Sequence, residues 1–143
     1  MLRAGREILA RVSIRDEWDL VVARRRTREL GSRHGLSATA AEALATAVTE
    51  IARNIVVHAG SGEILFGAGD HPEGGVIVTA WDTGPGMRIE EAMQDGFSTR
   101  GSLGLGLAGA RSLVDDFLVE SRVGEGTTVT LRKWASAQAG PRG

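Results

Sequence analysis

The clearest hydrophobic pattern lies in the middle of the chain and has the period of a helix. A helix is predicted over residues 38 to about 58, with Ser37 as its N-cap and Gly60 as its C-terminal stop. Its apolar positions are spaced by four, three and four residues, as one buried helical stripe requires. This stripe consists of Leu44, Val48, Ile51 and Ile55.

A second helical pattern precedes it, over residues 13 to 31. Ser13 or Asp16 is expected to cap its start, and Gly31 or Gly35 to end it. This helix carries four clustered arginines: Arg24, Arg25, Arg26 and Arg28. They predict a solvated face, in preference to a docking surface for a partner protein. The predicted buried side consists of Trp18, Val21, Val22 and Leu30.

Short β-rich segments make up most of the remaining chain. A strand is predicted at 7–14, a hairpin from 63–66 and 76–81, and two final strands at 117–122 and 127–134. A third helix is expected from about 103 to 116. The order predicts an α+β fold: a two-layer sandwich with a mixed, mostly antiparallel sheet covered on one face by helices.

Composition indicates one globular domain over 1–143, with a core at about 8–134 and a flexible tail at 135–143. The net charge of -1 gives no electrostatic basis for binding nucleic acid. The chain has no cysteine, so disulfides and thiolate chemistry are excluded. No stretch reaches the length of a membrane span or resembles a signal peptide, so a cytoplasmic protein is expected.

Glu50 and Asn54 are the first candidate site residues. They lie four apart on the predicted central helix, at the margin of its buried stripe. The asparagine can offer Mg²⁺ a neutral oxygen, and the glutamate can deprotonate a hydroxyl group. By itself the pair does not identify a catalytic or metal site, because polar pairs at this spacing are common on helix surfaces. A nearby histidine, His58, is expected to stabilise the helix end as a charge and not to act as a catalyst.

A second candidate follows the strand at 76–81, where Asp82 precedes Thr83-Gly84-Pro85-Gly86. Two glycines around a proline predict a tight turn to which a ligand can come close. The carboxylate would be a fixed acceptor for an exocyclic amine such as that of adenine, although an ordinary aspartate turn is an equally good interpretation. Thr127, at the start of the last strand, could place a hydroxyl group near the same ligand.

Glycines also precede the third predicted helix, at Gly101, Gly104, Gly106 and Gly109. Unpaired amides at a helix start favour phosphate. Residues 104–109 fit G-x-G-x-x-G, but no strand precedes them, so a dinucleotide-binding fold is rejected. The lysine of a P-loop is absent as well. The alternative interpretation of these glycines is that they let the helix pack closely on its neighbours. This role is compatible with phosphate binding.

Taken in order, four segments resemble the sequence boxes of the GHKL ATPase/kinase superfamily. They are T-E-I-A-R-N-I-V-V-H-A-G at 49–60, D-T-G-P-G-M at 82–87, G-S-L-G-L-G-L-A-G-A at 101–110 and G-E-G-T-T at 124–128. The resemblance covers about 8–134, and the order of the boxes makes it specific. Segments 14–30, 104–117 and 124–134 further resemble the RsbT-type serine-protein kinases of bacterial partner-switching pathways.

The resemblance implies ATP and Mg²⁺ as ligands and assigns a role to each box. Glu50 would be the general base and Asn54 would carry Mg²⁺. Asp82 would meet the N6 amine of adenine, and Gly84 and Gly86 would shape the adenine pocket.

Other implied contacts lie later in the chain. Thr127 would support the adenine contact through water, and residues 88–102 would form a lid over ATP. The remaining implied nucleotide contacts are Arg100, Gly101, Gly104, Leu105 and Gly106, of which Gly104 and Gly106 would face phosphates.

The implied function is phosphorylation of a serine or threonine on a separate STAS-type antagonist protein, in control of a stress or sigma-factor pathway. The alternative is an ATP-binding switch without catalysis, which activates a PP2C-type phosphatase or sequesters a sigma factor. Glu50 favours the kinase, because pure binding needs no base. The short chain argues against the ATPase domain of a chaperone or topoisomerase.

Overall fold

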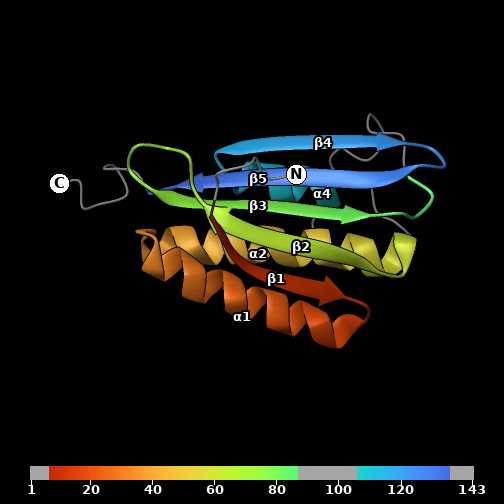
Figure 1. The fold of residues 1–143 in the computed structure, drawn as a ribbon, viewed down its shortest axis with the longest axis horizontal. Helices are drawn as coiled ribbons and strands as arrows, with labels where there is room; N and C mark the ends of the chain where they lie inside the picture. Colours follow the sequence, from red (N-terminus) through yellow and green to blue (C-terminus); the bar gives the residue numbers. More distant parts are fainter. Residues whose placement is uncertain (1–6, 87–105, 136–143) are drawn as a thin grey trace.

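Helices and strands are arranged in two layers (Figure 1), in a computed structural model that describes residues 7–86 and 106–135. One layer is a sheet of five described strands in the order β1-β2-β3-β5-β4, and the other is formed by the helices. The elements are β1 (Ile8–Ile14), α1 (Glu17–Arg33), α2 (Ala38–Asn54), η1 (Ile55–Ala59), β2 (Gly62–Ala68), β3 (Gly75–Asp82), α4 (Gly106–Ser112), β4 (Asp116–Arg122) and β5 (Gly126–Trp134).

Every strand pair among the described residues is antiparallel. β2 and β3 form the predicted hairpin, and β4 and β5 form a second one. The central pair, β3 and β5, joins the two hairpins across the segment that contains α4. The predicted α+β sandwich is therefore confirmed, and the described strands pair only in the antiparallel sense, where a mixed, mostly antiparallel sheet is predicted.

The central helix α2 begins and packs as its sequence predicts. The Ser37 hydroxyl oxygen accepts a hydrogen bond from the amide of Ala40, at 3.0 Å. All four residues of the predicted stripe are buried in the core against the sheet. After Asn54 the backbone widens into the π-helical turn η1, which ends at Gly60 with φ of 90°. Such turns in helices often occur at functional sites.

The predicted buried side of α1 is wrong except at Leu30. Trp18 is 70% exposed, and Val21 and Val22 also lie at the surface. The inward side instead carries Leu20, Ala23, Thr27, Leu30 and Gly31.

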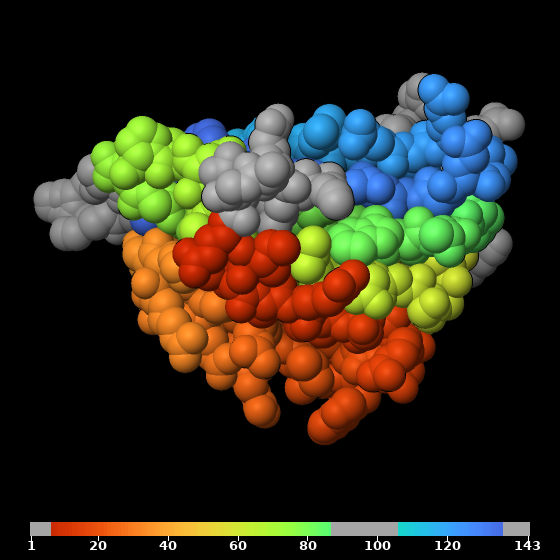
Figure 2. Space-filling view, viewed as in Figure 1, coloured from red at the N-terminus to blue at the C-terminus, as the bar shows by residue number. Residues whose placement is uncertain are grey.

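Small residues explain this face, because they let α1 lie close to α2. A Cβ atom on Gly31 would come within 3.1 Å of the Ala41 Cβ atom. The buried Thr27 hydroxyl donates to the Ala23 carbonyl at 2.7 Å, so its burial leaves no polar atom unpaired. Figure 2 shows the residues of β1, in red, between α1, in orange, and the strands that follow in the sheet.

The four arginines predicted to form a solvated face of α1 lie mostly at the surface, and only Arg24 is half-buried. Arg24 and Arg28 both pair with Glu42 on α2, and Arg28 Nε lies 2.8 Å from a Glu42 oxygen. The neighbouring guanidinium of Arg28 holds the pKa of Glu42 below its ordinary value. Arg25 and Arg26 are exposed, as predicted.

The third helix is shorter than predicted at its C-terminal end. α4 ends at Ser112 instead of about 116. The chain turns earlier because the Asp115 amide donates to the Arg132 carbonyl on β5, at 2.9 Å. Lys133 on the same strand donates to the Leu113 carbonyl at 3.0 Å. Strand pairing therefore overrides the helical period here. None of the helices in the described ranges is long and apolar enough to cross a membrane.

Candidate functional site

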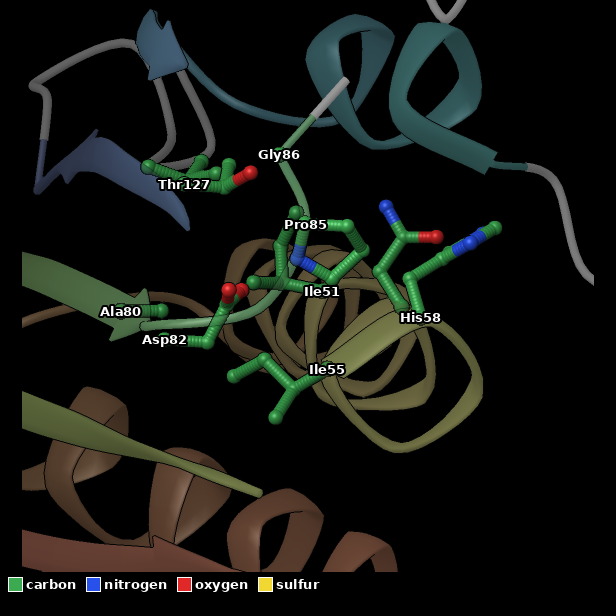
Figure 3. A pocket seen from close by; sticks show the side chains of 10 residues that line it. Ile51, Ile55, His58, Ala80, Asp82, Pro85, Gly86 and Thr127 are labelled. Carbon is green, nitrogen blue, oxygen red and sulfur yellow. The ribbon is translucent and has the colours of Figure 1, made fainter. Parts of the chain in front are cut away.

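Three segments far apart in the sequence meet at one end of the sheet. β3 ends at Asp82, β5 begins with Gly126 and Thr127, and α2 passes into η1 beside them. Asp82 and Thr127 are direct partners in the β3–β5 register. Figure 3 shows the labelled side chains of Ile51, Asp82, Pro85 and Thr127 converging on one pocket. Its lining residues are Ile51, Asn54, Ile55, His58, Ala80, Asp82, Pro85, Gly86, Thr127 and Val129.

One carboxylate oxygen of Asp82 is hydrogen-bonded, and the other has no donor among the described residues. Its Oδ1 atom accepts a hydrogen bond from the Gly84 amide at 2.8 Å, which fixes the side chain. No other donor among the described residues reaches this carboxylate. An ionised carboxylate is an acceptor only, so Oδ2 fits a donor such as an amino group.

The turn after Asp82 is held on two sides. A Cβ atom on Gly84 would lie 2.5 Å from the Ala59 Cβ atom, so only glycine lets the turn pack on η1. Gly86 has φ of 72°, and a Cβ atom there would overlap the Arg122 carbonyl oxygen. The Gly124 amide donates to the Pro85 carbonyl and ties the β4–β5 turn to this one. Backbone atoms therefore form this wall of the pocket, and a side chain at Gly84 or Gly86 would push them apart.

Thr127 places a nearly buried hydroxyl group on the opposite wall, where the residue is 8% exposed. Its Oγ1 atom lies 2.8 Å from the Ser121 hydroxyl oxygen on edge strand β4. Ser121 also donates to the Gly126 carbonyl at 2.9 Å. Sequence reasoning missed Ser121, because a serine alternating with exposed residues on an edge strand gives no signal of its own.

The predicted pair on α2 divides between two environments. Asn54, the last residue of α2, lines the pocket. Glu50, one turn earlier, is 8% exposed and is not among the lining residues. Its Oε2 atom accepts from Arg53 Nη1 at 2.8 Å, and its Oε1 atom from the Gly106 amide at 3.4 Å. Glu50 therefore faces the start of α4, while Asn54 lines the same pocket as Asp82.

The structure thus brings five predicted site residues together at the pocket and its turn, and they are Asn54, Asp82, Gly84, Gly86 and Thr127. Gly106 lies at the described start of α4, beside Glu50. Four others, and the predicted lid at 88–102, fall outside the described residues: Arg100, Gly101, Gly104 and Leu105.

The apolar wall of the pocket was not predicted as part of a site. Ile51 and Ile55 belong to the buried stripe of the predicted central helix, and their place three residues before and one residue after Asn54 was the available signal. His58 also lines the pocket, where sequence reasoning expected only a charge at a helix end. A mostly apolar pocket with a few fixed polar groups is typical of a small-molecule site.

The donor set fits a magnesium nucleotide. Asp82 and Thr127 would offer polar groups to a base, and Asn54 would offer a neutral oxygen that adds no negative charge beside phosphates. Among the described residues there is no group of three or more His, Cys, Asp or Glu that could hold a metal ion alone. Mg²⁺ at Asn54 would therefore depend on nucleotide phosphates for further ligands, as it commonly does.

A two-layer α+β domain with this pocket at the end of its central strands is of the histidine-kinase-like ATPase type. The chain belongs to the family described as the histidine kinase-like ATPase domain, which matches residues 13–133. A solved histidine kinase domain from the blue-light activated kinase of Erythrobacter litoralis EL346 has the same fold. The similarity has a TM-score of 0.52 at 20% identity, and covers 86% of this chain and 62% of the other.

Two kinds of relative are similar in sequence. The serine/threonine-protein kinase RsbT of Bacillus subtilis is 41% identical over 125 residues, which is 86% of this chain and 94% of the relative. The anti-sigma F factor of Geobacillus stearothermophilus is 36% identical over 101 residues, which is 60% of this chain and 68% of the relative. The corresponding factor of Geobacillus thermodenitrificans is 35% identical over 95 residues, with 62% and 65% covered.

Proposed function

We propose that this chain is an ATP-dependent serine/threonine-protein kinase whose substrate is a STAS-domain antagonist protein in a partner-switching pathway. The observation that carries the proposal is the meeting of Asn54, Asp82 and Thr127 in one pocket at the end of the central strands. The 41% identity to RsbT over nearly the whole of that kinase supports the reaction and the type of pathway.

Binding of ATP would begin with the adenine base. Asp82 Oδ2 would accept from the exocyclic amine, and the apolar wall at Ile51 and Ile55 would pack on the ring. Thr127 would add a polar contact on the β5 side. Because Gly84 and Gly86 hold the turn in place before binding, little conformational entropy of the turn is lost when the nucleotide binds.

Phosphoryl transfer needs chiefly positioning and charge neutralisation. Glu50 would accept the proton of the acceptor hydroxyl group. The oxygen of that hydroxyl group would form the bond to the γ-phosphorus while the bond between this phosphorus and ADP breaks. Asn54 would hold Mg²⁺, which supplies charge neutralisation to the phosphates. Gly104 and Gly106 remain predicted phosphate contacts, and Arg100, Gly101 and Leu105 remain predicted nucleotide contacts.

The test is transfer of the labelled γ-phosphate of ATP to purified candidate STAS-domain proteins. Wild type should label one partner on serine or threonine. Glu50→Ala should lower the rate by about 10²- to 10⁴-fold, the usual contribution of a general base. Asn54→Ala should abolish transfer at ordinary magnesium concentrations. Glu42→Ala is the matched control, because Glu42 lies on the same helix but pairs with α1.

A second function, an ATP-binding switch without catalysis, is favoured by one observation. Both oxygens of Glu50 already have donors, and Glu50 does not line the pocket. The similarity to anti-sigma F factors is compatible with either function. Tight binding of ATP with no transfer to any STAS-domain protein would support the switch. Absence of adenine-nucleotide binding in the presence of Mg²⁺ would exclude both.

A further inference from the structure

Glu50 is a predicted site residue whose environment the sequence did not anticipate. Its carboxylate lies between two donors, the guanidinium of Arg53 on α2 and the amide of Gly106 at the start of α4. The two bonds use different oxygen atoms and come from different elements. The carboxylate therefore connects the central helix to the glycine-rich helix.

The Arg53–Glu50 pair is more buried than the ion pairs that join α1 to α2. The Glu50 side chain is 10% exposed and that of Arg53 33% exposed. In the surface pair Arg28–Glu42, by contrast, both side chains are about half exposed, at 49% and 48%. Exposed pairs contribute little to stability, whereas removing one partner of a largely buried pair leaves the other charge unpaired and is costly. Loss of Arg53 would therefore leave the Glu50 carboxylate without its charged partner at a position largely shielded from water.

The geometry also restricts where the carboxylate can point. Arg53 is three residues after Glu50, so the two side chains lie on one helix face. With Oε2 held by Arg53, Oε1 is directed to the Gly106 amide. Without Arg53, a flexible glutamate side chain would take up other rotamers.

We propose that Arg53 is a positioning residue that holds Glu50 against the start of α4, in the orientation the phosphoryl transfer requires. This inference rests on the proposed function for the role of Glu50 as base. Arg53 touches neither nucleotide nor acceptor in this account and acts only through Glu50. Sequence reasoning gave Arg53 no role, because an arginine on a helix is ordinarily a solvated residue.

The kinetic test compares Arg53→Ala, Arg53→Lys and Arg28→Ala in the full chain, using the STAS-domain protein that accepts phosphate. Arg53→Ala should lower kcat by about 10- to 100-fold, the effect of misplacing a catalytic group by about 1 Å. KM for ATP should change by less than about threefold, because binding is not the step affected. Arg53→Lys should restore part of kcat, since it keeps a donor and a charge. Arg28→Ala should match wild type.

A double-mutant comparison separates positioning from a general effect on structure. In the Glu50→Gln background, Arg53→Ala should cause no further loss of kcat, because residues that act as one unit are not additive. Independent, additive losses would overturn the proposal. A fall in ATP affinity as large as the fall in kcat would also overturn it, since Arg53 would then contact the nucleotide.

A second measurement needs no kinase activity, so it keeps the two proposals apart. The amide resonance of Gly106 in a ¹H–¹⁵N spectrum reports the hydrogen bond to Glu50. Arg53→Ala and Glu50→Gln should move this resonance in the same direction, and Arg28→Ala should leave it in place. An unmoved resonance in Arg53→Ala refutes the positioning role even if the wild type is an active kinase. If wild type transfers no phosphate, the proposed function fails, and this spectrum alone decides whether Arg53 orients Glu50.

Discussion

Replacing Asp82 with asparagine changes one atom and one charge at the end of β3. The Oδ1 atom and its bond to the Gly84 amide can be kept, because an amide oxygen also accepts. The second oxygen becomes an NH₂ group, which donates. Toward the amine of adenine an acceptor would thus be replaced by a donor.

The magnitude follows from the loss of one hydrogen bond to a charged group. Such a bond contributes about 1.5–3 kcal/mol. At about 1.4 kcal/mol for each factor of ten, Asp82→Asn should weaken ATP binding by roughly 10- to 150-fold. The free energy of unfolding should change by less than about 1 kcal/mol, because the bond that holds the turn remains.

Isothermal titration with ATP and Mg²⁺ measures the affinity, and urea denaturation measures the stability. Asp116→Asn is the matched control, since Asp116 pairs with Arg132 on β5 and is absent from the pocket. ATP affinity equal to wild type in Asp82→Asn would remove Asp82 from the adenine site. An equal loss in Asp116→Asn would show that the effect is one of net charge.

Three further predictions concern stability. Trp18→Ala should change the free energy of unfolding by less than about 0.5 kcal/mol, because the ring is exposed. Leu44→Ala, in the core, should lower it by about 2–5 kcal/mol. Equal losses in urea denaturation would mean that Trp18 is buried, as the sequence predicts for α1. Gly86→Ala should destabilise the fold by more than about 1 kcal/mol, because φ is 72° there, and a melting temperature equal to wild type would contradict the turn geometry. The backbone N–H of Arg15 holds the pKa of Asp19 below its ordinary value, so the ionised carboxylate stabilises the fold at neutral pH and this contribution is lost as the pH falls through the folded-state pKa. Asp19→Asn should therefore cost about 1 kcal/mol at pH 7 and progressively less below about pH 4, and a loss that does not depend on pH would refute this assignment.

The sequence was sufficient to predict those elements in which the periodic apolar residues are also the buried ones. The stripe from Leu44 to Ile55 is unambiguous, because large aliphatic residues recur on one face and no competing face carries any. The β2–β3 hairpin was also predictable, since its strands are apolar and a glycine-rich loop separates them. Register and sheet order were not predictable, because they depend on pairings between distant residues.

The face of α1 could not be predicted from hydropathy. Trp18, Val21 and Val22 form an apolar side that competes with the buried one. The buried side uses Ala23 and Thr27, whose value lies in small size and in a satisfied hydroxyl group. Hydropathy ranks such residues below valine and tryptophan, although close helix packing requires them.

The candidate site was predicted as a set of residues but not as an arrangement. Asn54, Asp82 and Thr127 were identified from the order of the sequence boxes, and the structure brings them to one pocket. The division between Asn54 in the pocket and Glu50 at α4 could not be foreseen from a spacing of four residues. It depends on where α4 packs, and on an arginine that looks like a surface residue in the sequence.

The most direct test of the central claim is a crystal structure of the chain with Mg²⁺ and a non-hydrolysable ATP analogue. The account predicts the adenine amine within hydrogen-bond distance of Asp82, the ring between Ile51 and Thr127, and Mg²⁺ on the Asn54 side-chain oxygen. An analogue bound elsewhere, or a base that does not contact Asp82, would contradict the account.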